Sequence, residues 1–183
     1  MGEAKIIIEN FKVANVIFNS GHNNELELDL INLLDKKTIN YMFFSNNLLE
    51  INNYSFEFLN NINSDENEDS LIIYTQFNKR NILLMGDAGV SSENQIMDKY
   101  NFNKIDILKV GHHGSITSSG DKFLNRIKPR IALISVALNN RYNHPHKEVI
   151  NRLSKEQSTI YQTSIDGSIK IIFKDYLEVY TCY

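Results

Sequence analysis

Residues 105–115 read IDILKVGHHGS, and this segment is the strongest single indication of the fold. Its apolar half is typical of a buried β-strand, and its glycine-flanked end is typical of a sharp turn. A second apolar run, IALISV at 131–136, is followed by NNRYNHPH at 139–146, and a third run, ILLMGD, occupies 82–87. Strands that each end in a polar or histidine-rich loop predict an α/β sheet with a site at the strand ends.

The composition is that of one globular domain, which we expect to span residues 1–183. Hydrophobic content of 42% and charged content of 22% are ordinary for such a domain, and the chain shows no linker or repeat. No apolar run approaches the ~20 residues that a membrane helix needs. The only cysteine, Cys182, excludes an internal disulfide and a thiolate cluster. Any metal must therefore be held by imidazole and carboxylate, and the cellular compartment stays open.

Charge is unevenly distributed along the chain. Residues 104–155 contain ten Lys and Arg against three Asp and Glu, a net charge of +7, whereas residues 1–103 carry −8 and residues 156–183 carry −2. The basic stretch contains both histidine loops, and a local positive field concentrates anionic substrates. The alternative is an ordinary surface with scattered lysines.

The pattern of apolar residues predicts early strands in meander order, followed by regular β-α-β alternation. Helices are expected at 4–11, 24–36, 93–100, 119–127 and 147–154. Strands are expected at 13–18, 38–44, 48–51, 54–59, 70–77, 81–85, 105–110, 131–136, 158–162, 168–173 and 176–181. This order indicates mixed sheets covered by helices. Serine caps are expected for two helices, from Ser91 or Ser92 and from Ser118 or Ser119.

Asp87 and the first histidine loop supply the first candidate site residues. Gly86 lets the backbone come close to whatever the Asp87 carboxylate binds, and an aspartate there can bridge two cations. The alternative for Asp87 is a turn or cap residue. His112 and His113 are adjacent, so on extended backbone they would point in opposite directions and only one would reach the site. Ser115 could hold a phosphate oxygen or a water, and the alternative is an ordinary polar loop.

The second histidine loop places His144 and His146 two residues apart, with Pro145 stiffening the link. Both imidazoles could converge on one ion such as zinc, manganese or iron. Alternatively, one binds the ion and the other acts as a general acid, or the loop merely leads into a helix. Arg141 could form paired hydrogen bonds to a phosphate. We expect no role for the isolated His22.

In this order and spacing, the motifs resemble the metallo-β-lactamase-like domain at the C-terminal end of ComEC-type competence proteins, which are bacterial membrane proteins of DNA uptake. The resemblance covers most of residues 60–173. It implies a metallo-β-lactamase-like αββα sandwich and a hydrolase that uses one or two divalent metals, Zn or Mn. It also implies that Asp87 bridges two metals, and that one histidine of the pair His112 and His113 and one of the pair His144 and His146 complete the set of metal ligands. The assignments that we predict are Asp87, His112 and His146 for the metal, His113, His144 and Ser115 for catalysis, and Arg141 for the substrate phosphate.

One motif of that family, His-x-His-x-Asp-His, has no counterpart in this sequence. Residues 4–13 resemble the region that follows it. The resemblance therefore implies an N-terminally truncated domain whose exposed sheet edges favour a partner. That partner would be an upstream membrane-embedded polypeptide or a second copy of the chain.

The function that we expect is part of a metal-dependent phosphodiesterase or nuclease domain that acts on DNA during competence. The isolated chain is expected to bind metal weakly and to show little activity. The alternative is a non-catalytic module that binds nucleic acid or a phosphate ligand through the same loops. A third possibility is a structural remnant with vestigial histidines.

Overall fold

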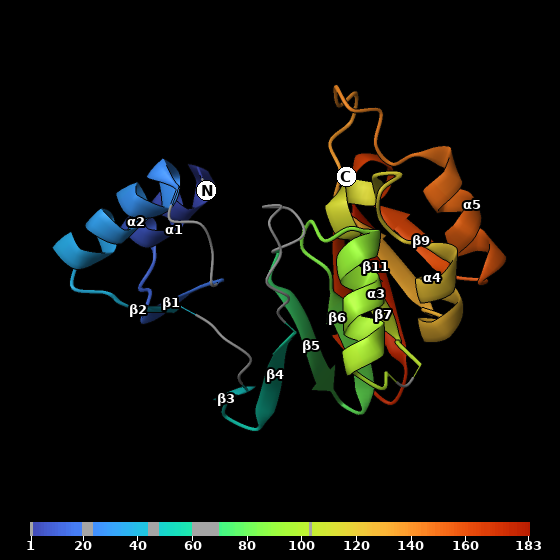
Figure 1. The fold of residues 1–183 in the computed structure, drawn as a ribbon, viewed down its shortest axis with the longest axis horizontal. Helices are drawn as coiled ribbons and strands as arrows, with labels where there is room; N and C mark the ends of the chain where they lie inside the picture. The colour runs from blue at the N-terminus through green and yellow to red at the C-terminus, as the bar shows by residue number, and fades with distance from the viewer. Residues whose placement is uncertain (1, 20–23, 44–47, 60–69, 103) are drawn as a thin grey trace. The chain divides into compact units, whose positions relative to one another are not determined.

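The computed structural model of the chain describes residues 2–19, 24–43, 48–59, 70–102 and 104–183. The chain divides into two compact units, Met1–Ser45 and Asn46–Tyr183 (Figure 1). The single domain expected over residues 1–183 stays a prediction. No helix among the described residues combines the length and the apolar character that crossing a membrane requires.

The first unit is small and contains two helices and two strands. In chain order these are α1 (Gly2–Asn10), β1 (Asn15–Phe18), α2 (Glu25–Lys36) and β2 (Asn40–Phe43). The strands β1 and β2 pair in parallel. Helix α2 begins after Asn24, whose side chain accepts a hydrogen bond from the backbone N–H of Glu27 and so caps the helix. A small core forms from Ile8, Phe18, Leu30 and Leu34.

The second unit is built on a seven-stranded sheet in which sequence order and spatial order agree. Its strands are β3 (Leu48–Ile51), β4 (Tyr54–Leu59), β5 (Ile72–Phe77), β6 (Arg80–Leu84), β7 (Ile107–Lys109), β8 (Ile131–Ile134) and β9 (Thr159–Gln162). Strands β3 to β6 form an antiparallel meander, whereas β6 to β9 run parallel. The parallel strands are connected by α3 (Val90–Lys99), α4 (Asp121–Ile127) and α5 (Lys147–Lys155).

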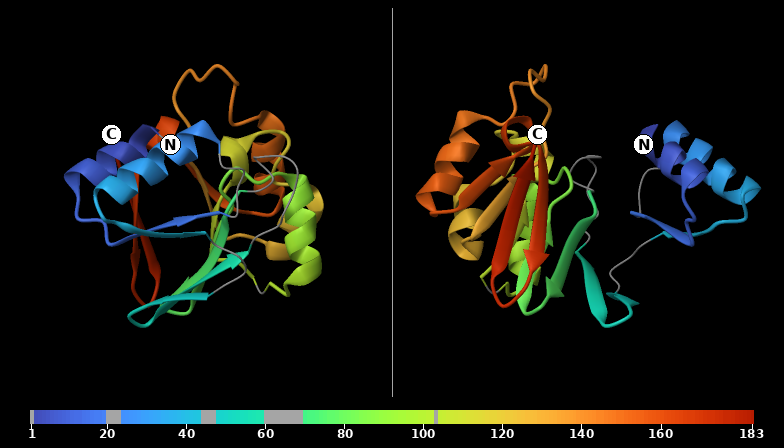
Figure 2. Two further views of the ribbon diagram at one scale, coloured as in Figure 1. Left: turned by 60° about the vertical axis from the view of Figure 1, so that its left-hand side comes forward. Right: turned by 180° about the vertical axis from the view of Figure 1, so that it is seen from behind.

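Alternating apolar residues in the parallel strands bury both faces of this sheet. Leu83, Leu108 and Ala132 belong to the main core, which they share with residues of α3, α4 and α5. Their chain neighbours Ile82, Ile107 and Ile131 belong to a separate core, as the period of two requires. That core includes the hairpin of β10 (Ser168–Phe173) and β11 (Leu177–Cys182). The hairpin and the helices therefore cover opposite faces of the sheet (Figure 2).

These layers confirm the predicted mixed α/β class and the β-α-β alternation of the C-terminal half. The helix α6 (Thr163–Asp166) was not predicted, because four residues are too few to show a period. The predicted serine caps are wrong: α3 begins after Gly89 and α4 begins after Gly120, in both cases without a side-chain cap bond.

Candidate functional site

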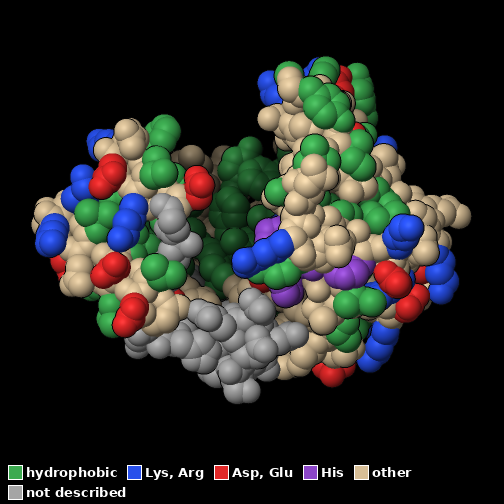
Figure 3. Space-filling model, turned by 90° about the horizontal axis from the view of Figure 1, so that it is seen from above, with side chains coloured by type: hydrophobic (Ala, Val, Ile, Leu, Met, Phe, Trp, Pro, Cys, Tyr) green, Lys and Arg blue, Asp and Glu red, His purple; other side chains and the backbone are tan. Residues whose placement is uncertain are grey.

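Three loops meet at one edge of the sheet, where the neighbouring parallel strands β6, β7 and β8 end. Two backbone hydrogen bonds join them: the N–H of His112 donates to the carbonyl of Gly86 (3.2 Å), and the N–H of His146 donates to the carbonyl of Gly114 (2.9 Å). The histidine side chains, drawn in purple in Figure 3, gather on this face of the molecule. The sheet thus brings together the strand-end motifs that the sequence singled out.

Four histidines and one aspartate form a continuous row across these loops. Nε2 of His113 lies 3.6 Å from Oδ1 of Asp87. The ring centroids are 6.5 Å apart for His112 and His113, 5.7 Å for His112 and His144, and 5.1 Å for His144 and His146. We call Asp87, His112, His113, His144 and His146 the histidine cluster. Of the two adjacent histidines, His113 is the one whose side chain lies beside Asp87.

The backbone of the first histidine loop differs from the extended form that the sequence predicted. Residues Gly111–Gly114 form a tight 3₁₀ turn, and both histidines have positive φ, 45° at His112 and 52° at His113. Non-glycine residues rarely adopt this conformation, and it is concentrated at functional sites. Gly114 has φ +79° and packs so closely that an added Cβ would lie 2.6 Å from Cβ of Pro145. Only glycine fits where the two histidine loops cross.

A hydrogen bond to the backbone fixes the orientation of His113. Its Nδ1 lies 2.6 Å from the carbonyl oxygen of Ser135, and because a carbonyl only accepts, Nδ1 carries the proton. In the neutral ring, Nε2 then presents a lone pair toward Asp87. A metal-bound histidine is commonly held in the same way, through a hydrogen bond from its other ring nitrogen. A cation or a proton between Nε2 and the carboxylate would satisfy both acceptors.

The electrostatics favour the neutral form of His144. Burial lowers its pKa below the ordinary value of 6.5, and the neighbouring His146, His112 and His113 lower it further. A neutral imidazole can bind a metal or accept a proton. The predicted role of His144 as a general acid therefore requires that it first gain a proton during the reaction.

Lys109 supports the Gly86–Asp87 turn. Its Nζ donates a hydrogen bond to the carbonyl oxygen of Gly86 at 2.6 Å. Burial lowers the pKa of Lys109, and the Asp87 carboxylate partly offsets this effect. The backbone N–H of Asp87 donates to Oγ of Ser70 at 3.0 Å. The carboxylate is thus presented from a turn that is bonded on both sides.

Two further residues that sequence reasoning missed hold the loops in place. The buried carboxylate of Glu93 on α3 accepts backbone hydrogen bonds from Ser119 (2.5 Å) and Gly120 (2.9 Å) at the start of α4. Asn140 bonds both the N–H and the carbonyl of His144, at 2.9 and 2.6 Å. Asparagine in a polar loop often bonds the nearby backbone, and this pattern could have identified Asn140 as a residue that shapes the turn. Nothing local in the sequence indicates that Glu93 is buried.

The remaining predicted residues are placed differently from the cluster. Ser115 is 6% exposed, and its hydroxyl pairs with Oγ1 of Thr117 at 3.0 Å, which gives it a role in the turn. Arg141 is exposed, and its guanidinium lies 4.6 Å from the ring centroid of Tyr142 and donates to the Tyr142 hydroxyl. Because the Arg141 side chain is exposed, a phosphate in solvent can reach its guanidinium. His22 lies outside the described residues.

The cluster offers metal-binding atoms but not a complete site. Imidazole and carboxylate suit zinc or manganese, and within the described part of the chain Nδ1 of His146 is buried without a hydrogen-bond partner. However, across the residues that the structure describes, no three His, Cys, Asp or Glu form a group that could hold an ion. The residues present therefore fit a metal only in part.

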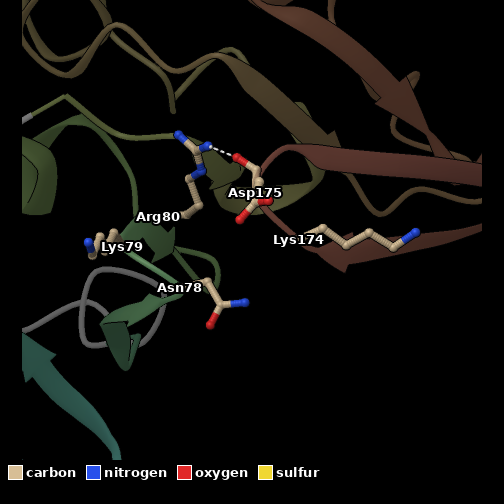
Figure 4. A pocket seen from close by; sticks show the side chains of 5 residues that line it. All are labelled: Asn78, Lys79, Arg80, Lys174 and Asp175. Carbon is tan, nitrogen blue, oxygen red and sulfur yellow. Dashed lines mark hydrogen bonds between the residues drawn. The ribbon is translucent and has the colours of Figure 1, made fainter.

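A hollow of about 650 Å³ lies away from the histidine cluster, at the turns that join β5 to β6 and β10 to β11. Figure 4 shows its lining, which is Asn78, Lys79, Arg80, Lys174 and Asp175. Arg80 donates to the backbone carbonyl of Asp175 at 2.8 Å and also lies 3.7 Å from Asp106. The Arg80 guanidinium is thus bonded to other groups of the protein and is less free to bind a ligand. We therefore take the histidine cluster, and not this hollow, as the candidate site.

The sequence is similar to segments of longer bacterial proteins. It is 29% identical over 188 residues to ComE operon protein 3 of Bacillus subtilis, and the alignment covers 100% of this chain and 24% of that protein. It is 36% identical over 115 residues to recombination protein 2 of Haemophilus influenzae, covering 62% and 14% of the two chains. Competence protein ComA of Neisseria gonorrhoeae is 33% identical over 119 residues, covering 63% and 17%.

This chain is similar to a competence protein and to a recombination protein. The resemblance that its motifs predicted is confirmed. The chain spans a quarter or less of the length of these three relatives. No family model matches it. Among solved structures, a metallo-β-lactamase superfamily protein of Thermotoga maritima is similar over 79% of this chain and 71% of that chain, with a TM-score of 0.39 and 11% sequence identity.

Proposed function

We propose that the histidine cluster is part of the active site of a metal-dependent phosphodiesterase that acts on DNA. The observation that carries this proposal is the meeting of Asp87 and His113 across two strand ends, with Nε2 of His113 lying 3.6 Å from Oδ1 of Asp87. The names of the relatives, a competence protein and a recombination protein, support DNA as the substrate. The net charge of +7 over residues 104–155 independently favours a polyanion.

Each residue of the cluster has a role in this proposal. Asp87 would hold a divalent cation together with imidazoles of the cluster, and the geometry favours His113 over His112 as its partner. A divalent cation in such a site stabilises the negative charge that develops on a phosphodiester under attack. His144, kept neutral, would accept a proton, and Arg141 would hold a phosphate oxygen. Because the described residues lack a three-donor group, we expect weak metal affinity.

The test is calorimetric titration of the purified chain with Mn²⁺ and with Zn²⁺. We expect binding that Asp87→Ala weakens at least about tenfold, because a charged donor is lost. Asp121→Ala is the matched control, since this exposed aspartate on α4 pairs only with Lys155 among the partners that the structure describes. Equal heats for the wild type and Asp87→Ala would overturn the proposal.

Hydrolysis of linear DNA provides a second measurement. We expect little or no hydrolysis from the chain alone, because metal affinity is weak. Robust hydrolysis that Asp87→Ala abolishes would contradict that expectation of weak activity while supporting the phosphodiesterase.

A non-catalytic module is the second candidate, and the absence of a three-donor group among the described residues favours it. In that case the loops bind DNA through charge alone. Binding would then fall steeply with salt and would not respond to a chelator. Chelator-sensitive binding would instead favour the phosphodiesterase.

A further inference from the structure

We propose that Tyr142, together with the small cavity beside it, binds one unpaired nucleobase of single-stranded DNA next to the histidine cluster. This inference deepens the proposed function and rests on it for DNA as the substrate. It assigns a role to Tyr142, a residue of the second histidine loop to which the sequence alone assigned none. The role is to hold the base while its phosphate lies against the cluster.

The volume and the lining residues of the cavity beside Tyr142 suit one nucleobase. Its volume is about 180 Å³, below the ~300–1,000 Å³ of sites for drug-sized ligands. Its lining combines aromatic, aliphatic and amide side chains, which are His113, Val136, Ala137, Asn140, Tyr142 and His144. A flat heterocycle with polar edges matches such a lining better than a phosphate or a metal ion does.

Tyr142 is arranged as a stacking surface. Its side chain is 57% exposed and so accessible to a ligand. Its ring lies nearly parallel to the ring of His144, with an interplanar angle of 24° and centroids 5.6 Å apart. The backbone N–H of Tyr142 donates to Oδ1 of Asn140 at 3.2 Å, which fixes the loop. Exposed aromatics held in this way stack on the bases of single strands without reading sequence.

A positive charge lies over the Tyr142 ring, where it can meet the DNA backbone. The Arg141 guanidinium lies 4.6 Å from the Tyr142 ring centroid, close enough for a cation–π contact. A stacking ring next to a cation is the usual combination in single-strand binding grooves.

The cavity and the cluster share two residues, His113 and His144. A base in the cavity would therefore bring its own phosphate within reach of the cluster. A base in a duplex is stacked on both faces and paired at its edge, so it cannot enter without unpairing. We accordingly assign single-stranded DNA, rather than duplex, to this surface.

The experiment measures binding of three labelled DNAs by fluorescence anisotropy, with a chelator present so that no metal-dependent cleavage occurs. The probes are oligothymidylate of about 16 nucleotides, the upper site size of single-strand binding domains, an abasic strand of equal length, and a duplex. We expect oligothymidylate to bind about tenfold more tightly than the abasic strand, since one stacked base contributes about that factor.

Variants test whether the preference for oligothymidylate over the abasic strand depends on Tyr142. Tyr142→Ala should bind oligothymidylate and the abasic strand equally, whereas Tyr142→Phe should keep most of the preference because it keeps the ring. Tyr176→Ala is the control, since this tyrosine is 59% exposed in the turn between β10 and β11. Arg141→Ala should keep the base preference but reduce the salt dependence by about one phosphate contact.

Three results would overturn the inference. They are equal affinity for the thymidylate and abasic strands, a preference that survives in Tyr142→Ala, and tighter binding of the duplex. Absence of any DNA binding would overturn it as well. Failure of the proposed function looks different, because the metal titration would then show no heat while the Tyr142-dependent base preference persists.

Discussion

Nε2 of His113 lies 3.6 Å from Oδ1 of Asp87, and the two residues come from turns after neighbouring strands, β7 and β6. Their side chains are 48% and 44% exposed. An exposed pair of this kind contributes only about 0–1 kcal/mol to folding. The fold therefore gains little stability from the contact, which is consistent with a role in binding.

The first prediction concerns this pair. Asp87→Ala and His113→Ala should each weaken Mn²⁺ binding about tenfold or more, and the double variant should lose less than the product of the two effects, because both residues hold one ion. Calorimetric titration of the four proteins measures the coupling. Strictly multiplicative effects would show that the two residues do not share an ion. The free energy of unfolding should change by less than about 1 kcal/mol in each single variant.

The second prediction concerns the pKa of His144. An NMR pH titration should give a midpoint below 6.5, because burial and the neighbouring histidines oppose protonation. His146→Asn should move the midpoint up toward 6.5, since it removes one of those neighbours. Because the unfolded chain binds this proton more readily, His144 contributes its full stability above pH 6.5 and loses it as the pH falls below that value. An unchanged midpoint in His146→Asn would contradict the electrostatic account.

The third prediction concerns the buried carboxylate that holds the start of α4. Glu93→Ala should lower the free energy of unfolding by about 3 kcal/mol, since it removes a charged acceptor and leaves the buried N–H of Ser119 and the partly buried N–H of Gly120 without it. Urea denaturation measures this change. Glu148→Ala, at an exposed position of α5, is the control and should stay within about 0.5 kcal/mol. Equal stabilities of the two variants would refute the role of Glu93.

The fourth prediction tests the main core. Leu108→Ala in β7 should cost about 2–5 kcal/mol, because this fully buried side chain packs against the helices. Leu138→Ala removes the same atoms from a side chain that is 71% exposed and should cost at most about 0.5 kcal/mol. Thermal unfolding of the two variants provides the comparison. A comparable loss in Leu138→Ala would mean that this loop is packed more tightly than the structure shows.

Much of the fold could be read from the sequence because two periods are strong in it. The alternation in Ile107, Leu108 and Lys109, like that in Ile131, Ala132 and Leu133, places successive residues on opposite faces of a sheet. Parallel neighbouring strands then bring their terminal loops together, as predicted. The location of the site followed from this topology alone.

The internal geometry of the site could not be read in the same way. Positive φ at His112 and His113 is unfavourable locally and arises from the surrounding contacts, so sequence reasoning placed these residues on extended backbone. On extended backbone only one of the two histidines was expected to reach the site, and the sequence left open which one. The burial of Glu93 depends on a contact 26 residues away, at Ser119, and no local pattern indicates it.

The bonds from His112 to Gly86 and from His146 to Gly114 involve only backbone atoms. The three loops are therefore assembled by folding itself, before any ion or substrate arrives. An incoming ligand would meet a pre-organised surface and would not lose affinity to the ordering of loops. A side-chain substitution in the cluster would then subtract one donor atom while the scaffold beneath it kept its shape.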